Sequence, residues 1–318
     1  MLIELFAGAG GMSAGAHNVG AHGVGIEWDA NACATRRANM LPTIFADVRH
    51  HHPTDFPDAS ILAGGPPCQT FSEAGDGSGR AEIADVIATI DRMSNGRITD
   101  PLSFTDERTA LILEPLRWIL EADRLERPYE AVVLEQVPTA LPVWEAYAAV
   151  LERRGYSVAV GVLHTEQYGI PQTRRRACLV ARADGPASLP TPTHRGYRKG
   201  VPQHEGDPDL KPWVSMGEVI RWGQPFEVIS NYGTGGDPKK RGRRTSAEPA
   251  FTVTGKISRL RLVAPDGAEL PRLTADEAGE LQGFGGGWKW AGNDIAQQVG
   301  NACPPPLAAA LLGAVIAA

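Results

Sequence analysis

The sequence predicts an α/β fold built on a mostly parallel, doubly wound sheet. Short apolar runs alternate with helix-like segments through the first third of the chain, as in a parallel sheet covered on both faces. A glycine stretch, FAGAGG at residues 6–11, directly follows the first apolar run, in the strand-turn-helix context where a ligand approaches the backbone. The 318 residues, 42% of them hydrophobic, suffice for a large domain with or without a smaller one.

Apolar runs and helical spacing place the elements in chain order. Strands are expected at residues 2–6, 23–26, 43–46 and 60–63, with helices at residues 12–19 and 30–39 between them. Further on, we expect a strand at residues 131–134, a helix at 143–154 and two strands near 158–163 and 178–181. Helical patterns return at residues 273–281 and from residue 295 to the end.

Residues 183–249 differ in composition from the rest of the chain. They are rich in proline, glycine, histidine and basic residues, which predicts a small second domain or a long insertion. The expected organisation is a large ligand-binding domain over residues 1–182, a small domain over 183–249, and a segment over 250–318 that completes the large domain.

Composition argues against several classes of protein. The four cysteines, at positions 33, 68, 178 and 303, form no CxxC pair and have no histidine cluster nearby, so we expect neither a disulfide framework nor a metal site. The N-terminus lacks the pattern of a signal peptide. The apolar tail at residues 307–318 is too short to span a bilayer and predicts a packed terminal helix. We therefore expect a cytoplasmic protein with no membrane segment.

A basic run stands out against the net charge of -6. An acidic chain argues mildly against a nucleic-acid partner, because polyanions are bound mainly through Lys and Arg. Five of the six residues at 239–244 (KKRGRR) are nevertheless basic. Alone, such a run is more often a solvated loop, and it gains meaning only beside chemistry on a nucleic acid.

Two acids follow the glycine stretch and favour an adenosine cofactor. Glu27 ends the second expected strand, where a carboxylate accepts hydrogen bonds from ribose hydroxyls. Asp47 follows the third, where it could accept from an adenine amine. A tight turn flanked by two surface acids is the alternative, and the spacing does not separate NAD from S-adenosylmethionine.

Cys68 is the candidate nucleophile. It begins the loop after the fourth expected strand, at the sheet edge where ligands of open α/β sheets bind. Pro66 and Pro67 fix their φ angles and reduce the freedom of this loop, which positions the thiol. A buried structural cysteine is the usual alternative. Glu135, at the end of another apolar strand on the same edge, favours a catalytic pair.

The motifs together resemble those of the DNA (cytosine-5) methyltransferase family, in the family's order and along nearly the whole chain. The matching stretches are FAGAGG, EWD (27–29), Asp47, PPCQTFS (66–72), LEQV (134–137), YGIPQTRRR (168–176), RLTADEAGELQGF (272–284) and QQVGNACPP (297–305). Eight stretches in register are specific, whereas any one of them is modest support.

The resemblance implies a Rossmann-like S-adenosylmethionine-dependent methyltransferase fold, with residues 183–249 as a small target recognition domain. It implies methyl transfer from S-adenosylmethionine to carbon 5 of cytosine in a specific double-stranded DNA sequence. The implied catalytic residues are Cys68, Glu135, Arg174 and Arg176. The implied cofactor-binding residues are Phe6, Gly8, Ala9, Gly10, Gly11, Glu27, Trp28, Asp47, Pro67 and Asn301. The expected DNA-binding residues are Gln69, Ser72, Lys239, Lys240, Arg241, Arg243 and Arg244. We expect a monomer in a bacterial or phage-infected cell, with a companion restriction endonuclease as a candidate partner.

The chemistry requires these residue types. A thiolate that adds to carbon 6 of cytosine converts the ring into an enamine whose carbon 5 can attack a sulfonium methyl. A free thiol with a pKa of about 8.5 is only ~3% ionised at pH 7, so the ring must be activated as well. Glu135, with its pKa raised in a closed pocket, can donate to ring N3. Arg174 and Arg176 resemble the family's arginines that brace the site and hold the base O2. The base must first leave the duplex stack.

The sequence departs from the family pattern in two places, and three other classes of protein remain as alternatives. Gln136 replaces the family's usual asparagine after the catalytic glutamate, and residues 76–104 exceed the family's mobile loop in length. A tRNA cytosine-5 methyltransferase shares the core motifs. A NAD-dependent dehydrogenase explains FAGAGG but leaves Cys68 without a role, and a non-catalytic or weakly active DNA-binding relative needs only the basic run.

Overall fold

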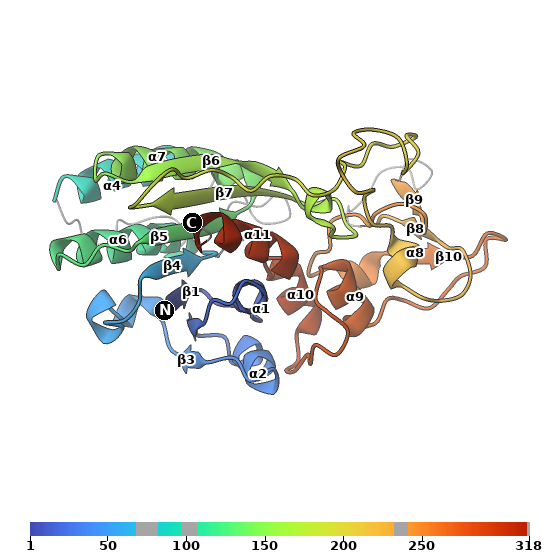
Figure 1. Ribbon diagram of the computed structural model, residues 1–318. Helices are drawn as coiled ribbons and strands as arrows, with labels where there is room; N and C mark the ends of the chain where they lie inside the picture. The colour runs from blue at the N-terminus through green and yellow to red at the C-terminus, as the bar shows by residue number, and fades with distance from the viewer. Residues whose placement is uncertain (68–81, 97–106, 232–240, 317–318) are drawn as a thin grey trace.

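A seven-stranded sheet organises the computed structural model, which describes residues 1–67, 82–96, 107–231 and 241–316 (Figure 1). Its strand order is β3-β2-β1-β4-β5-β7-β6. Five strands are parallel: β1 (Leu2–Leu5), β2 (Gly23–Glu27), β3 (Thr43–Phe45), β4 (Ile61–Gly64) and β5 (Ala131–Gln136). β7 (Arg175–Arg182) runs antiparallel to both β5 and β6 (Ser157–His164). The predicted α/β fold with a mostly parallel sheet is confirmed.

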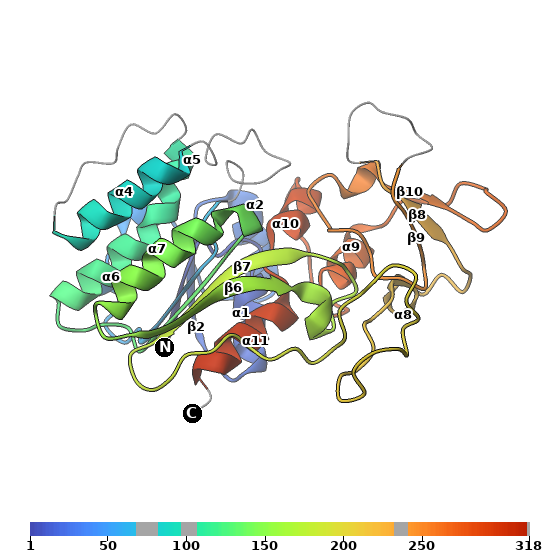
Figure 2. The same cartoon turned by 90° about the horizontal axis from the view of Figure 1, so that it is seen from above.

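Helices cover both faces of the sheet (Figure 2). One face carries α4 (Ile83–Ser94), α6 (Glu114–Arg124) and α7 (Leu141–Glu152), whose buried side chains join those of β1, β4 and β5 in one core. The other face carries α1 (Gly11–Asn18) and α11 (Pro305–Ile316). Because helices cover it on both sides, every residue of β5 is buried, as expected of a central strand.

The apolar C-terminal stretch is a core element. Residues Ile295–Ile316 are long and apolar enough to cross a membrane by length and composition alone. In the structure they form two helices, α10 (Ile295–Asn301) and α11, separated at residues 302–304. Leu307, Leu311 and Leu312 of α11 are fully buried against α1 and the sheet. The expectation of a packed terminal helix is confirmed.

A second, smaller sheet lies beyond β7, in the order β10-β8-β9. Its strands are β8 (Glu227–Ile229), β9 (Arg243–Thr245) and β10 (Arg261–Val263), all antiparallel. Its core continues into α9 (Ala275–Leu281) and α10. The expected boundary at residue 249 would separate β10 from its partner β8, so we propose to place the boundary after β10.

Part of the long segment at 76–104 is helix. Within it, α4 buries Val86, Thr89 and Ile90 and packs on α7. The other short helices of the described chain are α2 (Ala30–Ala38), α5 (Glu107–Ala110) and α8 (Met216–Val219). A 3-10 turn, η1 (Val48–His50), follows β3 and is important for the site.

Candidate active site

One pocket of about 370 Å³ opens at the carboxyl ends of the parallel strands. The glycine loop after β1, the ends of β2 and β3, the segment after β4 and the end of β5 all contribute to its wall. Arg176 of β7 and Gln297, Gln298 and Asn301 of α10 complete it. The sheet edge therefore brings together most of the described residues that the sequence assigned separately to a cofactor and to a reaction, although Gly10 and Arg174 do not line the pocket.

Gly10 and Gly11 of the glycine loop have no room for a side chain. Gly8 and Gly10 adopt positive φ angles of 51° and 98°, which glycine tolerates at little cost. A Cβ on Gly11 would lie 1.9 Å from the carbonyl oxygen of Cys303, so this glycine allows the loop to contact the C-terminal segment. Phe6 also has a positive φ, 57°, which is uncommon for a non-glycine residue and marks local backbone strain at the pocket wall.

Glu27 holds the glycine loop in place. Its buried carboxylate accepts hydrogen bonds from the backbone N–H groups of Gly8 (2.7 Å), Trp28 (2.9 Å) and Asp29 (2.8 Å). Burial raises the pKa of Glu27, and these three hydrogen bonds oppose that rise. The adjacent Trp28 lines the pocket with 61% of its surface exposed, so the wall offers a carboxylate beside an aromatic ring.

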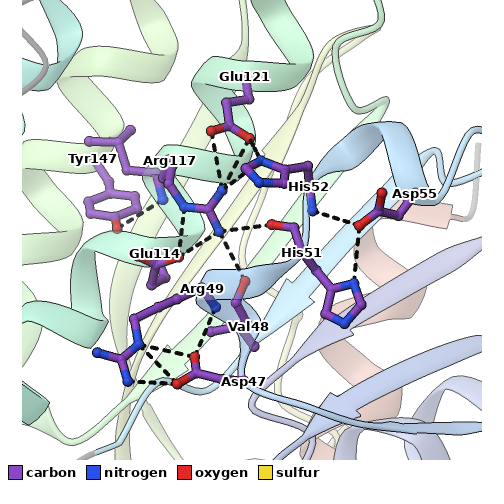
Figure 3. A network of polar contacts seen from close by, with 11 residues as sticks. Asp47, Val48, Arg49, His51, His52, Asp55, Glu114, Arg117, Glu121 and Tyr147 are labelled. Carbon is purple, nitrogen blue, oxygen red and sulfur yellow. Dashed lines mark hydrogen bonds and ion pairs between the residues drawn. The ribbon is translucent and has the colours of Figure 1, made fainter.

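Asp47 lies in the wall as predicted, but its carboxylate has a partner that the sequence did not suggest. Both oxygens accept from the guanidinium of Arg49, and Oδ1 also caps the turn by accepting from the Arg49 N–H (Figure 3). Burial alone would raise the pKa of Asp47, but the Arg49 hydrogen bonds outweigh it and the pKa is lowered. Asp47 is therefore ionised and already paired at neutral pH.

Glu135 and Arg176 form the polar centre of the reacting end. Oε1 of Glu135 lies 2.5 Å from Nε of Arg176, and both residues are more than 90% buried. A Cβ on Gly65 would lie 3.5 Å from Oε2 of Glu135, so the carboxyl group faces the segment that leads through Pro66 and Pro67 into Cys68. Cys68, Gln69 and Ser72 themselves lie outside the described residues.

Gln136 braces this segment. Its side-chain Nε2 donates to the carbonyl oxygen of Pro66 at 2.8 Å, and its Oε1 accepts from the Val137 N–H at 2.6 Å. The side chain is only 2% exposed. The longer amide thus supplies both a donor and an acceptor beside the proline segment.

The two predicted arginines have different surroundings. Arg176 faces the pocket, whereas the Arg174 guanidinium donates to the carbonyls of Val253 and Gly300, each at 2.8 Å. Arg174 is 2% exposed and does not contribute to the pocket wall. Its hydrogen bonds connect the start of β7 to the C-terminal segment, so Arg174 supports the site without facing the pocket.

Two arginines of the basic run at residues 239–244 make contacts within the protein. Arg243 pairs with Glu227 at 2.5 Å on the surface of the small sheet. The Arg244 guanidinium lies between the rings of Tyr197 and Phe251, 4.8 Å and 4.6 Å from their centroids. Arg241 is partly exposed, and Lys239 and Lys240 lie outside the described residues.

A buried ion pair beneath the glycine loop was not predicted. Nη1 of Arg36, from α2, lies 3.6 Å from Oε2 of Glu4 and donates to the carbonyl of Ala7 in the loop. Burial raises the pKa of Glu4, and Arg36 opposes that rise. The spacing of these residues in the sequence carries no signal of the contact, because it depends on how α2 packs on β1.

Within the described residues, no group of three or more His, Cys, Asp or Glu side chains could hold a metal ion. Burial raises the pKa of the Cys178 and Cys303 thiols well above the usual range, and that of Cys33 to about 11. These three cysteines are free thiols that stay protonated at neutral pH.

A family model and several known proteins match the sequence of this chain. The family model described as C-5 cytosine-specific DNA methylase matches residues 1–93 and 101–195. Type II methyltransferase M1.HphI of Haemophilus parahaemolyticus is 28% identical over 359 residues, covering 99% of this chain and 86% of that protein. Type II methyltransferase M.NaeI of Lentzea aerocolonigenes is 29% identical, covering 98% and 73%.

Solved structures show the same fold. The Dnmt2 methyltransferase of S. pombe superposes with a TM-score of 0.64 at 18% identity, covering 99% of this chain and 98% of that one. A putative DNA modification methyltransferase encoded within an E. coli prophage gives a TM-score of 0.57 at 16% identity, covering 98% and 97%.

Proposed function

We propose that this chain, which belongs to the C-5 cytosine-specific DNA methylase family, binds S-adenosylmethionine in the pocket at the sheet edge and uses Cys68 as its nucleophile. The chain is a DNA (cytosine-5) methyltransferase. The observation that carries the proposal is the shared pocket, whose wall includes Glu27 and the glycine loop together with Glu135, Arg176 and the proline segment that precedes Cys68.

The cofactor end of the pocket fits an adenosine-containing ligand. Its volume, about 370 Å³, lies in the range of small-molecule sites. Oε2 of Glu27 accepts one backbone hydrogen bond and keeps a second lone pair, which suits a ribose hydroxyl, whereas Oε1 already accepts two. The exposed ring of Trp28 offers an apolar face. When bound, S-adenosylmethionine supplies an electrophilic methyl group.

The residues at the reacting end can activate a cytosine. A target base must be flipped out of the duplex to reach this edge. The Cys68 thiolate then adds to carbon 6 while the Glu135 carboxyl group donates a proton toward N3, which leaves an enamine with a nucleophilic carbon 5. After carbon 5 accepts the methyl group, its proton passes to solvent, the N3 proton returns to the Glu135 carboxylate and the thiolate leaves, which restores the aromatic ring. Arg176 holds Glu135 in place through the 2.5 Å ion pair.

Radiolabel transfer tests the substrate. Purified protein is incubated with methyl-labelled S-adenosylmethionine and either mixed-sequence duplex DNA or tRNA. We expect label in DNA at carbon 5 of cytosine. Label in tRNA alone would overturn the proposed substrate and favour a tRNA cytosine-5 methyltransferase.

The biological setting follows from the relatives. Several are named Type II methyltransferases, and we propose by analogy that this enzyme protects a short DNA sequence in a bacterial or phage-infected cell, as a cytoplasmic monomer beside a companion endonuclease. Bisulfite sequencing of DNA from cells that express the chain tests this and identifies the modified sequence. Methylation at unrelated sequences would contradict a specific recognition site.

A further inference from the structure

Arg117 of α6 connects the helical layer to the backbone of the turn that follows β3 (Figure 3). Its Nη2 donates to the carbonyl oxygens of Val48 and His51, each at 3.0 Å. Its Nε donates to Glu114 at 2.8 Å, and its Nη1 donates to both oxygens of Glu121 at 3.2 and 3.1 Å. One side chain, 21% exposed, thus binds both ends of a short turn and two carboxylates.

That turn is a wall of the pocket. Asp47 and Val48 both line it, whereas Arg117 does not. Val48 is 3% exposed, and Asp47 caps the turn by accepting from the Arg49 N–H. Any displacement of the Val48 and His51 carbonyls therefore moves the part of the wall assigned to the cofactor base.

The sheet alone restrains this wall weakly. β3 has only three residues, Thr43–Phe45, and lies at the edge of the sheet, where it pairs with β2 alone. Phe45 is 64% exposed, so the strand has little cover on that side. Short edge strands contribute few hydrogen bonds, and the turn after β3 depends on contacts from elsewhere. Arg117 supplies two of them with a charged donor, the stronger kind of hydrogen bond.

Glu114 and Glu121 hold the Arg117 guanidinium in the orientation in which it contacts the turn. Glu114 and Glu121 lie three residues before and four residues after Arg117, so all three share one face of α6. They fix the rotamer of Arg117 and balance its charge. His52 adds a further contact, since its Nδ1 lies 3.0 Å from Oε2 of Glu121. The donor geometry is thus present before any ligand arrives.

We propose that Arg117 is a positioning residue for the cofactor site, which sets the place of Asp47 and Val48 without touching the ligand. This inference rests on the proposed S-adenosylmethionine site. It predicts a specific defect: Arg117→Gln weakens cofactor affinity about tenfold, because the two carbonyls lose their charged donor. The rate at saturating cofactor and the KM for DNA stay near the unmodified values, because Glu135 and Arg176 are untouched.

Arg154 offers a matched control. It is equally buried, at 20% exposed, and its guanidinium donates to the carbonyls of Ser94 and Val150 and pairs with Asp123 of α6. It connects α7 to α4 and α6 and does not line the pocket. Arg154→Gln therefore loses a comparable set of contacts with no effect expected on cofactor affinity.

Isothermal titration with S-adenosylmethionine measures the dissociation constant of the full chain and of Arg117→Gln, Arg117→Lys and Arg154→Gln, with thermal unfolding recorded for each. We expect a tenfold weaker constant for Arg117→Gln, an intermediate one for Arg117→Lys, and an unchanged one for Arg154→Gln. Equal constants for Arg117→Gln and the unmodified chain would overturn the inference, as would equal weakening in Arg154→Gln. No binding to the unmodified chain would instead overturn the proposed function.

Discussion

Glu135 is the proposed general acid for activation of the cytosine ring. Its carboxyl group is buried beside Arg176 and faces the proline segment, so it is shielded from solvent and directed toward the reacting end of the pocket. Glu135→Gln keeps the shape and a hydrogen-bond donor but cannot give up a proton. We expect turnover to fall by roughly 10² to 10⁴, as for loss of a general acid, while cofactor affinity is retained.

Single-turnover label transfer on duplex DNA measures this. Titration of cofactor in parallel shows whether the pocket is intact. If turnover stays within a few-fold of the unmodified enzyme, Glu135 is not the acid and the mechanism must be revised.

Glu27 links cofactor binding to pH. Burial raises its pKa above the ordinary value, so it takes up a proton at a higher pH than a free glutamate. The protonated group accepts fewer hydrogen bonds, and we therefore expect S-adenosylmethionine affinity to decrease as the pH is lowered from 7 through that raised pKa. Titrations across pH 5 to 8 check this. Glu27→Gln should bind weakly and lose most of the dependence; an unchanged slope would assign it to another group.

The contact between α1 and α11 contains two helical glycines with opposite expectations. A Cβ on Gly15 would lie 2.5 Å from Ala308 Cβ and 2.7 Å from the Pro305 carbonyl, so Gly15→Ala overpacks the interface and costs about 1–3 kcal/mol. A Cβ on Gly313 would meet only Val19, at 3.8 Å, and Gly313→Ala should gain up to about 1 kcal/mol from helix propensity. Urea unfolding of both variants compares them. Stabilisation by Gly15→Ala would contradict this prediction and would show that α1 and α11 can move apart at little cost.

Local patterns predicted the elements well where the periodicity was strong. The predicted strands at residues 2–6, 23–26 and 60–63 are confirmed within one residue at each end, because each is an apolar run next to a turn signal. Helix α6 was not predicted from the sequence, although it buries six residues. Nor was the direction of β7 predicted, because strand direction depends on tertiary pairing and not on periodicity.

We propose that the basic run at residues 239–244, which leads into the small sheet, contacts DNA. Arg244 is held between two aromatic rings and donates to the Pro249 and Ala250 carbonyls, so its role in the described structure is internal. We expect Arg244→Ala to lower the unfolding temperature. Lys239→Ala and Lys240→Ala should instead reduce the slope of log affinity against log salt by about one each, with stability unchanged.

Fluorescence anisotropy with a DNA duplex at several salt concentrations gives these slopes. The unmodified chain is the reference, and thermal unfolding is recorded for every variant. Slopes that do not change in either lysine variant would remove the basic run from the DNA interface.

The sequence suggested candidate residues for the chemistry of the site but not the residues that support them. Cys68, Glu135 and Glu27 could be proposed because Glu27 and Glu135 lie at the ends of strands and Cys68 comes shortly after one, all at the same sheet edge. Arg117 could not, since its contacts with the turn after β3 span more than 60 residues and appear only once α6 is packed. The Glu4–Arg36 pair was missed for the same reason.

Covalent trapping detects the bond between Cys68 and the target cytosine, on which the proposed mechanism depends. A duplex with 5-fluorocytosine at the modified position is incubated with the protein and S-adenosylmethionine, then analysed under denaturing conditions. Because fluorine cannot leave as a proton does, we expect a stable protein–DNA adduct with the unmodified chain and none with Cys68→Ser. An enzyme that methylates ordinary DNA but forms no adduct, or an adduct that survives Cys68→Ser, would contradict this mechanism.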